Sequence, residues 1–502
     1  MEEKEIFPYY LTEEEGRKVA VFPISYRLND LIENHSPLEA INNLTSSING
    51  QSSAKVIFYD GLIENQNKLG WLKIFLELLD TQKDKIETKL FNEYFTTNKP
   101  VGRIYLPVVL SKKDHSIPSK AYLLRYPEAN LLHKKMLRVS KKINSAQEGK
   151  SRFKVIKDMI SQAQDLLLRG QTCTIYTNHL SPGIYLAQER HSTYSNLIKA
   201  ESLIETASRQ SSKWIQVSEI DYNCDGHDEI IIETETQNIY ISPELGGTVL
   251  EHDFKPKSIN LTNTISRRKE LYHKDLDNQV FDRYLKLNFI DHFLDKDIGL
   301  EKLSSNNFNS LANEFILPYH VEKIKAKEET CKIALTLKTN LIKLTHSPEI
   351  ELIKQFSTRA GDSSLIVDYT LTNKSQDVID FIFGIEFNLN PFHSYDENNF
   401  CYLEGNPRNK TLNTSLKSKE EIREINQISL CNKSLEMDLT LFWNKPCVLY
   451  RYPIETIVTN SNQSESIYQG LTILLHWQIK LEPTIFWELS VTQQTKTTQE
   501  VF

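Results

Sequence analysis

The sequence predicts a multidomain fold in which an α/β segment is followed by a helical segment and then by a large antiparallel β-sandwich. Three patterns support this prediction. Strand-like and helix-like stretches alternate over residues 1–119, apolar residues recur at every third or fourth position over 120–210, and short β-rich runs separated by turn residues fill 211–502. A chain of 502 residues is long enough for each predicted domain to bury its own core.

The composition excludes several function classes. A net charge of −7 provides no general basic surface for nucleic acid or anionic lipid. The six cysteines have no CxxC spacing, which argues against a zinc cluster or a disulfide scaffold. The opening MEEKEIFPYY has no apolar core of a secretory signal, and the longest apolar runs are far shorter than a membrane span. We therefore expect a cytoplasmic protein with no membrane or nucleic-acid partner.

Residues 1–119 combine β-branched runs with amphipathic stretches. The predicted strands are KVAVFPIS, AKVIFYDG and GRIYLPV at 18–25, 54–61 and 102–108, and the predicted helices are PLEAINNLTSSI and WLKIFLELLDTQ at 37–48 and 71–82. This alternation favours a parallel sheet or barrel, in which functional side chains lie where strands end. Asp60 has such a position and is a candidate catalytic carboxylate. The alternative is that Asp60 caps the turn or the next helix.

The helical and β-rich segments are predicted from their periodicity. PEANLLHKKMLRVSKKINSA is amphipathic, and FKVIKDMISQAQDLLLRG ends at Gly170 as a helix C-terminus does. After 214, runs such as CKIALTLKTN and VIDFIFGIEF indicate a sandwich with two broad sheets. Glu386 and His393 lie near a strand end where a sandwich can hold a sugar, although a structural role fits them equally well. SRRKELYH at 266–273 is predicted to be a surface turn or short helix.

A candidate metal-binding loop begins the β-rich segment. Asp221, Asn223 and Asp225 place oxygen side chains at every second position, Gly226 follows, and Glu229 can close the set. Such spacing suits a hard cation, so the four residues are candidate calcium ligands, with no organic cofactor expected. The loop is not an EF-hand, because the twelfth position falls inside a predicted strand. The alternative is an Asx-type turn, since tight turns select the same residues.

Three motifs resemble a known family. YPEANLLHKKML at 126–137, the stretch 214–273 and RYPIETIVTNSNQSESIYQG at 451–470 are similar to the C-terminal part of 4-α-glucanotransferases and α-amylases of glycoside hydrolase family 57. The resemblance implies the last part of a (β/α)7 barrel, a helical middle domain and a C-terminal β-sandwich. It also implies an α-glucan or maltooligosaccharide as partner. VIFYDG resembles the strand whose paired aspartates supply the acid/base, and Tyr59 and Asp60 stand at those two positions.

The sequence departs from the family near the implied active site. Thr174, Thr177 and Asn178 replace an Asp and a Trp-His, and LIENQNKLGW is shorter than the family's segment. The opening FPYYLTEEEGRKVAVFPIS resembles the segment that follows the family's nucleophilic Glu. Retaining glycosidases need two carboxylates, so we expect this polypeptide to be non-catalytic by itself and to bind carbohydrate. Two alternatives remain: another polypeptide completes a split glucanotransferase or α-amylase, or a carboxylate from Glu13–Glu15 or Glu64 replaces the nucleophile.

Overall fold

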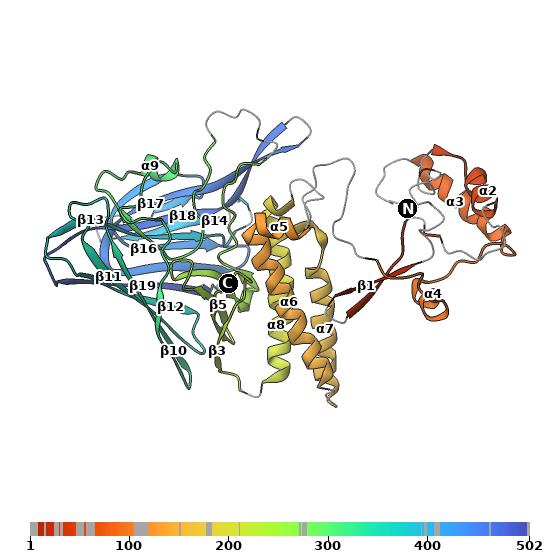
Figure 1. Cartoon of the computed structure of the whole chain (residues 1–502), viewed down its shortest axis with the longest axis horizontal. Coiled ribbons are helices and arrows are strands. Elements are labelled where there is room, and N and C mark those ends of the chain that lie inside the picture. Colours follow the sequence, from red (N-terminus) through yellow and green to blue (C-terminus); the bar gives the residue numbers. More distant parts are fainter. Residues whose placement is uncertain are drawn as a thin grey trace. The chain divides into compact units, whose positions relative to one another are not determined.

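The structure, a computed structural model, divides the chain into two compact units, residues 1–113 and 114–502 (Figure 1). The description covers residues 9–14, 17–24, 30, 34–46, 55–56, 66–104, 119–149, 152–176, 183–209, 211–270, 273, 279–392, 394–395, 399–405, 412–460 and 463–498. Among these residues, no helix is both long enough and apolar enough to span a lipid bilayer.

The smaller unit contains one hairpin and three helices in its described part. Strands β1 (Tyr10–Glu14) and β2 (Arg17–Val21) pair antiparallel, and the helices are α2 (Pro37–Ser46), α3 (Gln66–Thr81) and α4 (Phe91–Thr97). Ala40, Ile41 and Phe75 pack α2 against α3. In the described residues, two predicted strand segments meet in an isolated parallel bridge between Ile24 and Val56, and Arg103 of the third forms another with Leu11 of β1. Both predicted helices are present, whereas the barrel remnant stays a prediction.

The larger unit begins with four α-helices, as the 3.6-residue periodicity predicts. They are α5 (Ser119–Arg125), α6 (Pro127–Glu148), α7 (Lys154–Gly170) and α8 (Ala187–Ser208), with short 3-10 turns η2 (Cys173–Ile175) and η3 (Gly183–Tyr185) before α8. Pro127 at the first turn of α6 is favourable because its missing N–H has no partner to lose there. Leu132, Val139 and Ile143 of α6 pack against Leu197 and Ile204 of α8.

A small antiparallel sheet follows the helices. Its strands are β3 (Ile215–Ile220), β4 (Glu229–Thr234), β5 (Gln237–Ser242), β6 (Thr248–Phe254) and β7 (Ile259–Asn260), in that spatial order. Every residue of β4, β5 and β6 is buried. One face, with Ile230 and Ile232, joins the main core, and the other, with Ile231, packs against Leu131 of α6. The small sheet is therefore a middle layer with helices on one side.

The second sheet has twelve strands. They are β8 (Ile290–Leu294), β9 (His320–Lys327), β10 (Thr330–Asn340), β11 (Glu349–Arg359), β12 (Ser364–Asn373), β13 (Ile379–Leu389), β14 (Asn399–Gly405), β15 (Leu412–Ser415), β16 (Glu420–Asn432), β17 (Met437–Asn460), β18 (Gln463–Leu481) and β19 (Phe486–Thr497). Strand β17 pairs with β16, β18 and β19 along its length, all antiparallel. Two sheets share one apolar core, so the sheet-rich region with several helices agrees with the predicted helical and β-sandwich architecture.

Candidate functional site

A cavity of about 190 Å³ lies in the larger unit, lined from β17, β18, η3 and residues 267, 268, 273 and 279–281. Tyr452, Glu455 and Thr456 reach it from β17, and Ser466 from β18. The β17–β18 register shifts between Ile454 and Glu455. Such a β-bulge bends a strand and re-aims its side chains, and bulges are common beside functional sites. The extra residue here is Gln469 of β18, and its amide donates hydrogen bonds to the Tyr185 carbonyl and the Thr456 hydroxyl at the cavity.

Two polar atoms at this cavity are buried without a hydrogen-bond partner among the described residues. They are the Tyr452 hydroxyl and Gln279 Nε2. Tyr452 is only 1% exposed, and burial raises the pKa of its hydroxyl, so the group is neutral at physiological pH. An unsatisfied buried donor costs about 1–3 kcal/mol, which a ligand hydroxyl or a water in the cavity would offset. The cavity therefore presents unused hydrogen-bonding capacity to a small polar molecule.

Three charged side chains at the cavity, Arg267, Arg268 and Glu455, already have partners. An Arg267 nitrogen lies 2.7 Å from Asp282, and an Arg268 nitrogen lies 2.7 Å from Glu128 on α6. Glu455 accepts a hydrogen bond of 2.8 Å from the Tyr395 hydroxyl. The segment SRRKELYH is therefore not a surface turn throughout, because Arg267 is buried by its ion pair. This prediction was wrong because sequence spacing does not reveal a partner such as Asp282.

Tyr185 connects the cavity to the family-like frame Gly183-Ile-Tyr-Leu. Gln469 of β18 donates one hydrogen bond of 2.8 Å to the Tyr185 carbonyl and another of 2.8 Å to the Thr456 hydroxyl. The Tyr185 hydroxyl donates to Glu270 at 2.5 Å. Side chains from β18 and from the 266–273 segment thus hold η3 at the rim. Tyr452 and Gln279 were missed by sequence reasoning, although RYPIET, which contains Tyr452, was noted for its family resemblance.

The predicted calcium loop brings three of its four residues together. Asn223 Nδ2 donates to Asp225 at 2.8 Å and to Glu229 at 3.1 Å. Asp221 instead accepts the backbone N–H groups of Asp225 and Gly226 at 3.0 and 3.1 Å. Gly226 has φ +97°, a conformation that glycine adopts readily. The His227 N–H donates to Asp225 Oδ1 at 2.9 Å, which is the hydrogen bond of an Asx-type turn.

Glu229 is the most buried member of the loop. Its carboxylate accepts the backbone N–H groups of Tyr222 and Asn223 and the Ser242 hydroxyl, at 3.0 to 3.2 Å. Burial raises the pKa of Glu229 to about 7, although these hydrogen bonds favour the charged form. Asn223 Oδ1 is buried without a partner. The loop thus holds one carboxyl group with a pKa near 7 and one amide oxygen that has no hydrogen-bond partner in the described residues.

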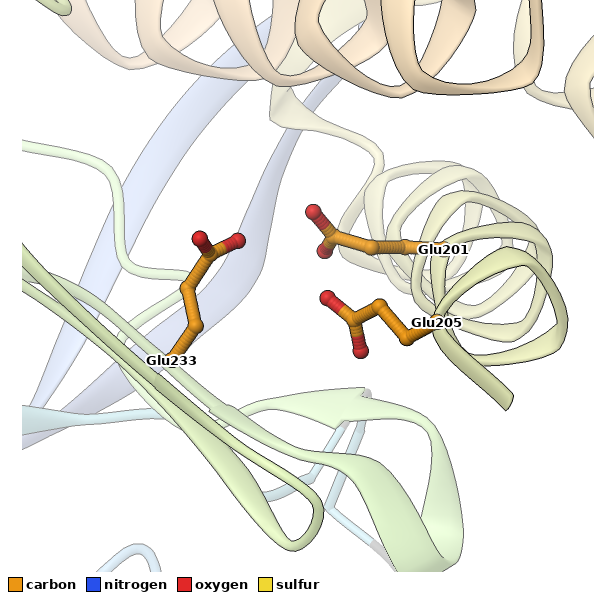
Figure 2. A group of neighbouring side chains, drawn as sticks. All are labelled: Glu201, Glu205 and Glu233. Atoms are coloured by element: carbon orange, nitrogen blue, oxygen red, sulfur yellow. The ribbon is translucent and has the colours of Figure 1, made fainter. Parts of the chain in front are cut away.

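A second acidic group lies between α8 and β4. Glu201, Glu205 and Glu233 converge with carboxylate oxygens within 4.8 Å of one another, the one such group of three or more potential metal-ligating side chains in the described residues (Figure 2). Lys142 Nζ lies 2.7, 2.9 and 2.5 Å from their oxygens. An ammonium group thus supplies the positive charge at their centre, so this group is an ion-pair cluster rather than a metal centre.

The ion-pair cluster extends across the interface between the helices and the small sheet. Lys135 of α6 is fully buried and contacts Asp253 at 2.5 Å and Glu251 at 3.5 Å. Five carboxylates face four cations here: Glu201, Glu205, Glu233, Glu251 and Asp253 against Lys135, Arg138, Lys142 and Lys255. Burial raises the pKa of Glu251 to about 7, and the nearby Asp253 adds to this effect.

Glu386 is not available to a sugar. It is fully buried, and it accepts hydrogen bonds from Tyr284, Lys286 and His292 at 2.7 to 2.9 Å. Of its two predicted roles, the structural one fits this environment. His393, Asp60, Glu64, Thr177 and Asn178 lie outside the described residues, so their predicted roles stay predictions.

Comparison with known proteins supports the family resemblance that the sequence motifs indicate. The model of the family "Alpha-amylase/4-alpha-glucanotransferase, C-terminal" matches residues 221–280 and 275–491, and that of the corresponding middle domain matches 119–204. "Alpha-amylase 1" of Dictyoglomus thermophilum is 27% identical, with 98% of this chain and 77% of the relative aligned. The "4-alpha-glucanotransferase" of Thermococcus kodakarensis is 24% identical over 95% of this chain and 74% of its own length.

The fold of this chain also resembles that of a solved structure. The crystal structure of 4-alpha-glucanotransferase from Thermococcus litoralis matches 98% of this chain and 76% of its own length, with a TM-score of 0.69 and 21% identity. At that identity the likeness concerns the fold. Because the C-terminal family model alone covers more than half of the sequence, this chain belongs to the alpha-amylase/4-alpha-glucanotransferase family, glycoside hydrolase family 57.

Proposed function

We propose that this polypeptide binds α-glucan in the cytoplasm and does not by itself hydrolyse or transfer it. The main observation is the loss of active-site residues at positions that match the family: Tyr59 replaces one of two aspartates, and Thr174, Thr177 and Asn178 replace an Asp and a Trp-His. Uncharged hydroxyl and amide groups cannot replace a carboxylate that orients a sugar, nor an aromatic face on which a sugar stacks. Retaining glycosyl transfer needs one carboxylate as nucleophile and a second as acid/base, and Tyr59 supplies neither.

Glucan binding is supported by family membership and by the cavity. Relatives of this chain are named as α-amylases and 4-α-glucanotransferases, and both names refer to α-glucans. The cavity offers unpartnered Tyr452 and Gln279 groups to a polar ligand. Sugar hydroxyls both donate and accept hydrogen bonds, so a hydroxyl-rich chain fits this lining.

The test is an activity assay beside a binding assay. The purified chain and its Asp60→Asn variant are incubated with maltotriose and amylose, and the products are separated by chromatography. We expect neither hydrolysis nor disproportionation above the heat-inactivated control, and retarded migration of the native chain in gels that contain amylopectin. Transfer by the wild type that Asp60→Asn removes would overturn the non-catalytic proposal. Activity that requires a second, co-expressed polypeptide would favour the split enzyme.

We also propose that the loop Asp221–Glu229 binds calcium. A half-turn of the Asn223 amide would place Oδ1, now unpartnered, beside the carboxylates of Asp225 and Glu229. Three oxygens facing one another repel unless a cation lies between them, and calcium prefers such oxygen ligands. Asp221, at the start of the loop, would supply a further carboxylate.

A further inference from the structure

We propose that the cavity beside the β17–β18 bulge is a subsite for a single glucosyl unit, whose hydroxyls bind the Tyr452 hydroxyl and Gln279 Nε2. This inference rests on the proposed glucan binding and locates that binding in this cavity. Both atoms are buried, both line the cavity, and neither has a partner among the residues that the structure describes.

The size of the cavity limits the ligand to one ring. Pockets for drug-sized molecules measure about 300–1,000 Å³, whereas this cavity measures about 190 Å³. Exposed Lys419, Glu455 and Ser466 line it, so it opens to solvent. A glucosyl unit at the end of a chain can therefore enter while the rest of the chain stays outside.

The lining has the chemistry of a neutral sugar site. The Tyr452 hydroxyl can donate and accept, and Gln279 Nε2 donates, so each matches a sugar hydroxyl. Phe281 and Pro453 add apolar surface that suits the C–H face of a pyranose ring. Tyr452 is held in β17 by ladder pairing with Thr472 of β18, which fixes its backbone before a ligand arrives.

An anionic ligand fits less well. Arg267 and Arg268 both line the cavity, but each is already within 2.7 Å of a carboxylate oxygen. Lys419 also lines it, but its side chain is exposed, and solvent and salt screen its charge. A phosphate would have to compete with Asp282 and Glu128 for these guanidinium groups, at a cost in buried charge. The structure therefore favours a neutral, hydroxyl-rich ligand over a sugar phosphate.

The experiment measures maltotriose binding by isothermal titration calorimetry with the full chain. Tyr452→Phe removes only the hydroxyl, and Gln279→Ala removes the amide. Tyr468→Phe is a matched control, because the Tyr468 hydroxyl is also buried and unpartnered but does not line the cavity. Loss of one hydrogen bond should weaken binding roughly three- to tenfold in each cavity variant. Tyr468→Phe should bind as the wild type does, and inorganic phosphate should not compete.

The outcomes separate the subsite from the proposed function. If the wild type binds maltotriose and both cavity variants bind it equally well, the subsite is wrong and glucan binding lies elsewhere on the chain. If the wild type binds no maltooligosaccharide or amylopectin, the proposed function fails together with the subsite. Competition by inorganic phosphate that Tyr452→Phe abolishes would overturn the neutral-sugar assignment. Equal weakening by Tyr468→Phe would show a general packing effect and would also overturn it.

Discussion

Among the buried carboxylates between α6, α8 and the small sheet, Glu251 has the weakest contacts with hydrogen-bond donors and cations. Its Oε1 accepts hydrogen bonds of 3.3 Å from the Tyr194 and Tyr222 hydroxyls, and its Oε2 lies 3.5 Å from Lys135, which is closer to Asp253. Burial therefore dominates, and the pKa of Glu251 rises from its ordinary 4.5 to about 7. Between these two values, the folded protein binds a proton that the unfolded chain has released.

The expected effect of this proton is a loss of stability with rising pH. A carboxyl group whose pKa is raised on folding stabilises the folded state below about pH 4.5. This stabilisation is lost as the pH rises through about 7. Glu251→Gln removes the titration and keeps the shape. The free energy of unfolding of the variant, relative to wild type, should therefore rise by roughly 2–3 kcal/mol between about pH 4.5 and pH 8. Urea denaturation at both pH values measures this.

Glu219→Gln is the control for this comparison. Glu219 is exposed on β3, in the same small sheet as Glu251. Its substitution should leave the pH dependence of the unfolding free energy as in the wild type. If Glu251→Gln also follows the wild-type pH dependence, Glu251 is charged throughout this range and its pKa is not raised.

Lys142 is the second residue with a testable role. It is the shared partner of Glu201, Glu205 and Glu233, and the attraction of Lys142 lowers the pKa of Glu233 against the effect of burial. Lys142→Met leaves these carboxylates undercompensated, which should cost roughly 3–5 kcal/mol of unfolding free energy near pH 7. The loss should shrink as pH falls towards about 4.5, where the carboxylates protonate. Denaturant titrations at both pH values report it.

Lys141→Met provides the comparison for Lys142→Met. Lys141 is exposed at the preceding position of α6, so its substitution should change the unfolding free energy by less than about 0.5 kcal/mol. Equal effects of the two substitutions would mean that the cluster adds nothing specific to stability.

At the scale of elements, the loop between β3 and β4 gives a prediction about calcium. Millimolar calcium acting on a micromolar site should add roughly 4 kcal/mol to the unfolding free energy and raise the melting temperature. Asp225→Ala should abolish the shift, whereas Asp228→Ala, an exposed neighbour, should retain it. Calorimetry in calcium and in chelator decides the question. Identical melting curves would leave the loop as a turn.

The elements themselves were predictable where the pattern is local. Helices α6 and α7 follow from apolar spacing, with Pro127 at the start of one and Gly170 at the end of the other. The position of Lys135 was not predictable, because the sequence places lysines on the polar side of this helix. Its partner Asp253 lies 118 residues away, and helical periodicity carries no information about such a partner.

The same limit applied to the candidate site. Spacing indicated the Asp221–Glu229 loop, because its members are close in sequence, and the structure brings three of them together. The cavity joins Gln279 to Tyr452 from distant parts of the chain. Gln279 lies outside β17 and β18, so only the completed fold places it at the same cavity as Tyr452. Local motifs were therefore found, and the long-range cavity was not.

At the scale of the whole molecule, the helices and both sheets form one compact unit over 114–502. The sequence predicts that a fragment from Ser211 folds alone. In such a fragment, Glu233, Glu251 and Asp253 would lose the cations of α6. We expect the fragment 211–502 to melt at a lower temperature than 114–502, because buried carboxylates without partners are destabilising. Scanning calorimetry of both fragments measures the difference, and coincident melting would show that the helices contribute little to stability.

The charge pairs between α6 and the small sheet also set an order of events during synthesis. Lys142 precedes Glu233 by 91 residues, and Lys135 precedes Asp253 by 118. At about 5–20 residues per second, the ribosome makes α6 roughly 5 to 25 seconds before it makes these partners. During that interval the helix surface that later becomes interior still faces water. The lysines keep that surface hydrated. Until the sheet is made, the nascent chain therefore exposes less apolar area than an all-leucine helix would.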